Sequence, residues 1–170
     1  DTDRLYAQLM EEFSWGNIDN PDVNIDYFSK YNTGVFQLQN VFNSLADNLL
    51  KEGKTEKARA VLKKSISLFP VSVFQYNNYS LQQIELMFDS GLNDSGLQFL
   101  NGFLQSVQAN LRYYAQFEKR QRQALNFDIM AEMYYYQQLL QLIHSRKLIE
   151  KFPDAKQSFE NFAMLFSDSL

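Results

Sequence analysis

Two apolar stripes joined by a short turn constrain the fold of this chain most strongly. The first stripe, within residues 35–49, repeats apolar residues at helical spacing and is followed by Gly53, in the position of a helix C-cap. The second, within residues 58–69, has the same spacing and ends at Pro70, which cannot continue a helix. Because only the turn Glu52–Thr55 separates the two, we expect antiparallel helices that form a hairpin.

Bulky and small residues occur in this hairpin in a pattern that resembles a tetratricopeptide repeat. Small side chains at Ala46, Ala58 and Ser65 let the two helices approach closely, so that larger residues fill the space around these contacts. The residues that define the repeat are Phe42, Leu45, Ala46, Leu49, Gly53, Ala58, Leu62, Ser65 and Pro70. The resemblance implies an all-α fold, a superhelix of tetratricopeptide-like stacked helical hairpins with flanking capping helices, whose inner face binds a peptide or a partner's helix.

The periodicity along the rest of the chain predicts a single helical-repeat domain, 1–170. Its parts are an N-terminal helix and long loop at 1–34, repeat 1 at 35–70, a degenerate repeat 2 at 77–119, and C-terminal helices at 122–170. The second repeat rests on Gly91 and Gly96, which follow Gly53 and Ala58 at equal intervals.

Two further features are predicted in the C-terminal part. A long helical segment from Ala124 to Phe152 is expected to bend near Ser145. Asp154, with Gln157 three residues later, predicts a capping box at the start of the last helix.

The loop over residues 14–33 is long for a compact domain, so we expect it either to pack over a neighbour or to serve a function. Packing is the favoured interpretation, because the apolar side chains of this loop need burial. They are Trp15, Ile18, Val23, Ile25 and Phe28.

The composition argues against several kinds of site. The 170 residues include no cysteine, which excludes disulfides and Cys-based zinc sites, and a single histidine, His144, which excludes a multi-histidine metal site. The net charge of −4 argues against nucleic acid as a partner. Asp22, Asn24 and Asp26 alternate as calcium ligands can, but the glycine and distal glutamate of a calcium loop are lacking. We therefore expect a domain without a catalytic site, metal or cofactor.

Aromatic residues are the candidates for an interaction surface. The run Tyr134–Tyr136, together with Tyr113 and Tyr114, is consistent with a stacking surface for a sugar or a peptide. Consecutive residues of a helix face different directions, so a mixture of core and rim positions is the favoured interpretation. Trp15, Tyr113 and Tyr134 are the candidate interaction residues.

The opening residues resemble a stretch found in one bacterial family of large polytopic membrane proteins, similar to protein O-mannosyltransferases. The resemblance lies in Asp1–Tyr6, Leu9–Met10, Phe13, Trp15–Asn17 and Asn20–Val23, and continues through Asn40, Phe42, Leu45–Ala46, Leu49, Glu52–Lys54, Ala58, Val61–Leu62 and Pro70. In that family the stretch belongs to a soluble C-terminal tail with helical repeats.

This resemblance implies a non-catalytic protein-interaction domain attached to a membrane-embedded, glycosyltransferase-like protein. We expect it on the extracytoplasmic, periplasmic side of the inner membrane, where it binds an acceptor protein, a partner subunit or the rest of its own chain. The chain begins at Asp1 rather than Met, as expected for part of a longer protein. The alternative is a free-standing tetratricopeptide-like adaptor that binds peptides or proteins.

Overall fold

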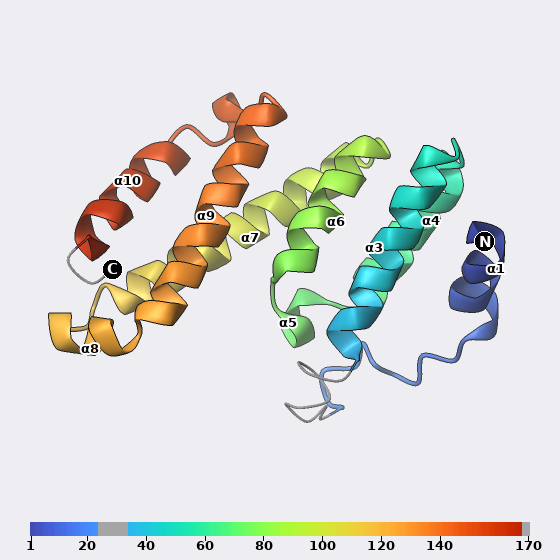
Figure 1. Ribbon diagram of the computed structural model, residues 1–170, viewed down its shortest axis with the longest axis horizontal. Coiled ribbons are helices and arrows are strands. Elements are labelled where there is room, and N and C mark those ends of the chain that lie inside the picture. The colour runs from blue at the N-terminus through green and yellow to red at the C-terminus, as the bar shows by residue number, and fades with distance from the viewer. Residues whose placement is uncertain (24–33, 168–170) are drawn as a thin grey trace. The chain divides into compact units, whose positions relative to one another are not determined.

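The computed structural model describes residues 1–23 and 34–167, and within these ranges the chain is helical and has no strand (Figure 1). The all-α prediction is therefore confirmed. The helical elements are α1 (Thr2–Ala7), η1 (Gln8–Glu12), α3 (Val35–Lys51), α4 (Thr55–Leu68), α5 (Val71–Phe74), α6 (Asn78–Asp89), α7 (Asn93–Tyr114), α8 (Lys119–Ala124), α9 (Asn126–Ser145), η2 (Ile149–Lys151) and α10 (Ala155–Phe166).

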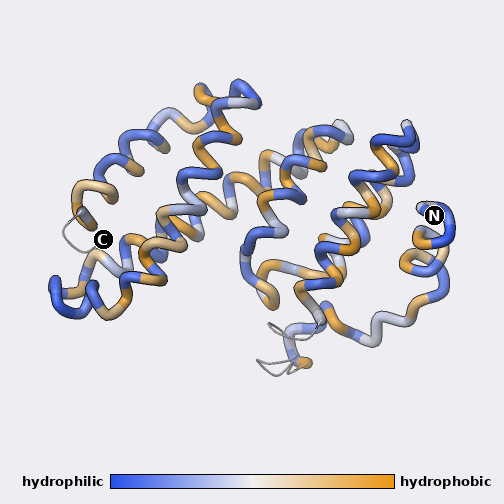
Figure 2. Tube along the Cα trace, in the orientation of Figure 1, coloured by the Kyte–Doolittle hydropathy of each residue, from blue (hydrophilic) through white to orange (hydrophobic). Residues whose placement is uncertain are grey.

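The chain divides into two compact units, Asp1–Leu97 and Gln98–Leu170, with the boundary inside α7. Figure 2 shows hydrophobic positions recurring along each long helix among hydrophilic ones, as expected when each helix buries one face. No helix in residues 1–23 or 34–167 combines the length and apolar character needed to cross a bilayer.

The first unit is built on the hairpin α3–α4, which occupies the range predicted for repeat 1. Its core consists of fully buried side chains: Phe42, Leu45, Ala46, Leu49, Ala58, Val61 and Leu62. Burial of each large apolar side chain contributes about 1.5–3 kcal/mol. At the turn, Gly53 has φ +74° and the Lys54 amide donates to the Leu49 carbonyl at 2.8 Å, which closes α3. The predicted turn glycine thus has the backbone conformation that favours glycine.

Helix α6 packs against both helices of this hairpin (Figure 1). Its N-cap residue Asn77 donates to Gln39 near the start of α3, at 3.0 Å. Arg59, near the start of α4, donates from Nε to the Ser90 carbonyl at the end of α6, at 2.6 Å. Helix α6 therefore runs parallel to α3 and antiparallel to α4. Between these ends, buried Gln83 donates to Ser65 at 2.9 Å.

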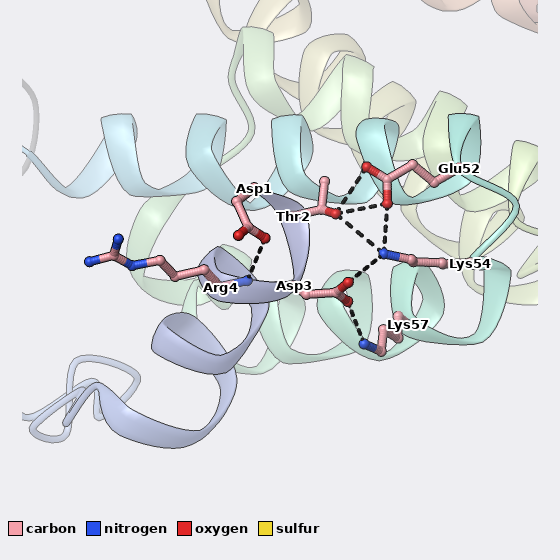
Figure 3. A network of polar contacts seen from close by, with 7 residues as sticks. All are labelled: Asp1, Thr2, Asp3, Arg4, Glu52, Lys54 and Lys57. Atoms are coloured by element: carbon pink, nitrogen blue, oxygen red, sulfur yellow. Dashed lines mark hydrogen bonds and ion pairs between the residues drawn. The ribbon is translucent and has the colours of Figure 1, made fainter.

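The N-terminal helix α1 is tied to the hairpin by charged contacts (Figure 3). The Asp3 carboxylate accepts from Lys54 Nζ and from Lys57 Nζ, each at 2.7 Å, and the Thr2 hydroxyl donates to Glu52 at 2.7 Å. These lysine hydrogen bonds lower the pKa of Asp3 to about 2. Because the groups are exposed, we expect salt to weaken this attachment.

The second unit contains the rest of α7 with α8, α9 and α10. Tyr136, fully buried on α9, connects its neighbours: its hydroxyl accepts from Gln108 Nε2 of α7 at 2.6 Å and donates to the Ala155 carbonyl of α10 at 2.9 Å. Its ring also meets that of Phe159 edge-on, with centroids 5.4 Å apart. One tyrosine thus holds three helices together.

Two details of this unit differ from prediction. The expected bend near Ser145 is instead the end of α9, because Lys147 adopts φ +57° and Leu148 donates to the Ile143 carbonyl at 2.8 Å. The predicted capping box at Asp154 is wrong, since Asp154 precedes α10 without a side-chain cap and Gln157 donates instead to Asn161.

Candidate functional site

Trp15 packs inside its own unit. The indole Nε1–H donates to the Leu9 carbonyl at 3.2 Å, and the ring lies 5.3 Å from Phe42 and 6.3 Å from Phe69 between centroids. Phe13 adds a ring contact at 4.7 Å. These contacts attach the N-terminal segment to α3–α4, in line with the packing interpretation of the predicted loop. Residues 24–33 of that loop, with Asn24, Ile25, Asp26 and Phe28, lie outside the described residues.

The other two predicted residues, Tyr113 and Tyr134, are exposed on neighbouring helices. Tyr113, at the end of α7, is 56% exposed, and Tyr134, on α9, is 53% exposed. Within the run of three tyrosines, Tyr134 is exposed, Tyr135 is half-buried and Tyr136 is fully buried. This distribution is the mixture of core and rim positions that helical geometry predicts.

Two carboxylates of α9, those of Asp128 and Glu132, lie near the half-buried ring of Tyr114. Glu132 of α9 accepts a hydrogen bond from Asn110 of α7 at 2.7 Å. Burial raises the pKa of Tyr114, and the nearby charges of Asp128 and Glu132 raise it further. Burial likewise raises the pKa of Tyr135, and Glu132 adds to the effect. Both acids are therefore close to the ring of Tyr114, and Glu132 is also close to that of Tyr135.

Ring contacts extend this acidic centre to the exposed tyrosines. Tyr113 lies 5.7 Å from Tyr114, and Tyr134 lies 6.0 Å from Tyr135, between ring centroids. We call the resulting patch the tyrosine surface, defined by Tyr113, Tyr114, Asp128, Glu132, Tyr134 and Tyr135. It includes the two aromatic residues predicted from sequence, Tyr113 and Tyr134, and adds the two acids that lie near Tyr114.

The electrostatics of the tyrosine surface are unbalanced. Burial, and secondarily the charge of Asp128, raise the pKa of Glu132, against the lowering effect of the Asn110 hydrogen bond. Among the described residues, neither Asp128 nor Glu132 forms an ion pair with a basic side chain. The surface therefore holds two carboxylates without an ion-paired base in the part of the chain that the structure describes.

Exposed apolar side chains border the same helix face. Phe127 is 84% exposed and Met130 is 53% exposed, and with Tyr134 they follow the spacing of one face of α9. Exposed aromatic faces together with carboxylates attract positively charged side chains through cation–π contacts and ion pairs. The arrangement is therefore suited to binding a cation.

The acids of this surface were missed in the sequence analysis. The available signal was their spacing: Asp128 and Glu132 are four residues apart, and Tyr135 follows Glu132 by three, which places all three on one side of a helix. Their approach to Tyr114 depends on how α7 packs against α9 and has no local signal. His144 is exposed near the end of α9, as a surface histidine would be.

Comparison with protein-family models, curated proteins and solved structures found no match to this chain.

Proposed function

We propose that this chain is a non-catalytic protein-interaction domain that binds a positively charged segment of a partner protein at the tyrosine surface. The observation that carries the proposal is the pair Asp128 and Glu132, which lack a basic partner among the described residues. Both acids lie near Tyr114, and Glu132 also lies near Tyr135. A Lys or Arg side chain of a partner supplies the missing charge.

The energetics favour a cation at this position. The raised pKa of Glu132 means that its surroundings disfavour the carboxylate, so a positive charge brought close relieves a cost already present in the free domain. Each exposed cation–π contact contributes about 0.5–1 kcal/mol, and each exposed ion pair contributes about 0.2–1 kcal/mol. A few such contacts produce a weak and salt-sensitive interaction, as in many transient complexes.

The proposal includes a tetratricopeptide-like arrangement of the helices. It is supported by the buried small residues of α3–α4 and by the packing of α6 against both helices of that hairpin. Helix α1, which attaches to the hairpin through Asp3, then serves as the N-terminal cap.

The resemblance of the opening residues supports a larger context, in which the domain is part of a membrane-embedded, glycosyltransferase-like protein on its extracytoplasmic side. The alternative is a free-standing adaptor. Fractionation of the native cells with an antibody against this domain separates the two. A polypeptide much larger than 20.0 kDa that stays with carbonate-washed membranes supports the first, and a band at the mass of this chain refutes it.

Binding to the tyrosine surface is tested with a short labelled peptide of alternating arginine and glycine, and with its counterpart that carries glutamate in place of arginine. The arginine peptide should bind and shift the amide resonances of Tyr113, Glu132 and Tyr134, and added salt should weaken it. The glutamate peptide should not bind. Binding of both peptides, or shifts confined to other helices, would refute the proposal.

Charge-neutral variants identify the groups responsible. Glu132→Gln keeps an oxygen that accepts a hydrogen bond from Asn110. It should lower the affinity for the arginine peptide about threefold to fivefold, which corresponds to the loss of one exposed ion pair. Glu150→Gln, at an exposed glutamate of η2, is the matched control and should not change binding. Because the carboxylate of Glu132 is disfavoured by burial, Glu132→Gln should also stabilise the fold at neutral pH. Equal weakening by the two variants would mean that only overall charge matters.

A further inference from the structure

The hairpin α9–α10 repeats the local geometry of α3–α4. In α3–α4, the Lys54 amide donates to the Leu49 carbonyl at 2.8 Å; in α9–α10, the Leu148 amide donates to the Ile143 carbonyl at 2.8 Å. Aligning the first helices at this bond pairs core residues that are buried in both hairpins: Phe42 with Tyr136, Leu45 with Leu139, and Leu49 with Ile143.

The second helices align as well. Ala58 and Ala155 are both buried small residues near the helix start, and pairing them also matches buried Phe69 with buried Phe166. The longer connection in α9–α10 contains the three-residue turn η2. The same alignment pairs Arg59 with Lys156 and Leu62 with Phe159. The segment Asn126–Phe166 is therefore a third hairpin of the same kind, although sequence analysis assigned it only as C-terminal helices.

In the first hairpin, one face is occupied by α6. Asn43 of α3 donates to the Tyr79 carbonyl at 2.9 Å, and Arg59 of α4 donates to the Ser90 carbonyl at 2.6 Å. The cationic side chain thus satisfies a backbone carbonyl at the C-terminal end of the docked helix, where the helix dipole is negative.

In α9–α10, the corresponding face is an open groove of about 620 Å³. Gln137, at the position of Asn43, and Lys156, at the position of Arg59, both line it. The lining is mostly apolar and includes Leu140, Ile149 and Phe159, with Gln141, His144 and Glu160 as its other polar residues. Ile149 is 54% exposed, so the groove presents apolar surface that α10 and α9 leave uncovered.

We propose that this groove binds an amphipathic helix of a partner protein, which lies against α9–α10 as α6 lies against α3–α4. The helix runs parallel to α9, and its apolar stripe covers Leu140, Ile149 and Phe159. Its negative C-terminal end meets Lys156, as the C-terminal end of α6 meets Arg59 in the first hairpin. Lys156 is available for this contact, because its side chain is 83% exposed and its Nζ lies 3.9 Å from Glu160 Oε1, which is long for an ion pair.

A second copy of this chain is a poor occupant, because the helix with the required form, α6, is already packed against α3–α4 of its own chain. The groove is separate from the tyrosine surface and its expected ligand is different. The inference therefore goes beyond the proposed function, and each can fail without the other.

The probe for this groove is a synthetic labelled peptide with the sequence Asn77–Leu92 and leucine in place of Gln83. The replacement is made because Ser65, which accepts from Gln83, aligns with Phe162 in the third hairpin. The peptide should shift amide resonances in the second half of α9 and the first half of α10. No shifts there at millimolar peptide, or shifts confined to other elements, would overturn the proposal.

Variants test the orientation and the contact surface. Ile149→Asp should lower the affinity for the peptide at least about tenfold, because it places a charge on the apolar surface of the groove. Lys156→Glu should lower this affinity about threefold to fivefold, because the glutamate repels the negative C-terminal end of the bound helix. Met164→Asp, at a residue of α10 that is 67% exposed and outside the groove, is the matched control and should bind as the parent does. Glu132→Gln should leave this peptide unaffected.

Two outcomes would contradict the assignment. Equal weakening by Ile149→Asp and Met164→Asp would show that the peptide binds any exposed apolar side chain. Self-association of the domain in sedimentation experiments, abolished by Ile149→Asp, would show that the occupant is a second copy. Circular dichroism of each variant confirms that the fold is retained.

Discussion

Replacement of Gly91 by alanine should destabilise the first unit more than replacement of Gly53, although both glycines close a helical turn of the same kind. Gly53 has φ +74° and open space around its Cα, whereas Gly91 has φ +81° and faces a neighbour. A Cβ added at Gly91 would lie 2.7 Å from Arg59 Nη2. The guanidinium has to move, and its Nε donates to the Ser90 carbonyl at 2.6 Å.

The expected magnitudes follow from these contacts. A left-handed conformation costs a non-glycine residue about 1–2 kcal/mol, and the lower entropy of unfolded alanine offsets about 0.5–1 kcal/mol. Gly53→Ala should therefore cost about 1 kcal/mol. At Gly91 the displaced Arg59 also weakens a charged hydrogen bond, which adds about 1 kcal/mol at this partly exposed position. We expect Gly91→Ala to cost about 2 kcal/mol in total.

Urea denaturation followed by tryptophan fluorescence measures these differences, because Trp15 is the only tryptophan and packs against Phe42 and Phe69. In an Arg59→Ala background, the extra cost of Gly91→Ala should disappear, which gives a coupling of about 1 kcal/mol in a double-mutant cycle. If Gly91→Ala costs no more than Gly53→Ala, the contact between Gly91 and Arg59 does not hold α6 in place and the reasoning is wrong.

Two further predictions concern other polar contacts. Tyr136→Phe removes a buried hydroxyl that forms hydrogen bonds with Gln108 and Ala155. It should lower the free energy of unfolding by about 1–3 kcal/mol, measured by chemical denaturation. Tyr113→Phe, at an exposed ring, is the control and should change this free energy by less than about 0.5 kcal/mol. The folded-state pKa of Asp3, about 2, lies below its usual 3.8, so its stabilising contribution is complete above the usual value and is lost as the pH falls toward 2. Thermal unfolding should accordingly show that Asp3→Asn destabilises the domain at neutral pH and has no effect at pH values below the folded-state pKa. A stability difference between variant and parent that stays constant across this pH range would contradict the role of Lys54 and Lys57.

The sequence carried little information about the tyrosine surface. It indicated Tyr113 and Tyr134 as candidate interaction residues, and helical geometry alone predicted that three consecutive tyrosines divide between core and rim. The approach of Asp128 and Glu132 to Tyr114 requires α7 to pack against α9, and such long-range packing has no local signal. Trp15 shows the same limit: its need for burial was predictable, but its position beside Phe42 and Phe69 was not.

The sequence by itself determined the helical class and the first hairpin, because helical spacing, the turn at Gly53 and the stop at Pro70 act between residues close together in the chain. Only the tertiary structure revealed the third hairpin. Its turn uses Lys147 at positive φ, whereas the turns after α3 and α6 use Gly53 and Gly91. The residue type therefore hides a conformation that the surrounding hydrogen bonds impose. The tertiary structure also decided which faces are covered: α6 fills one groove, and no helix of the described residues fills the equivalent groove on α9–α10. Local patterns place an apolar stripe on a helix, but whether another helix covers it depends on contacts between residues far apart in the sequence.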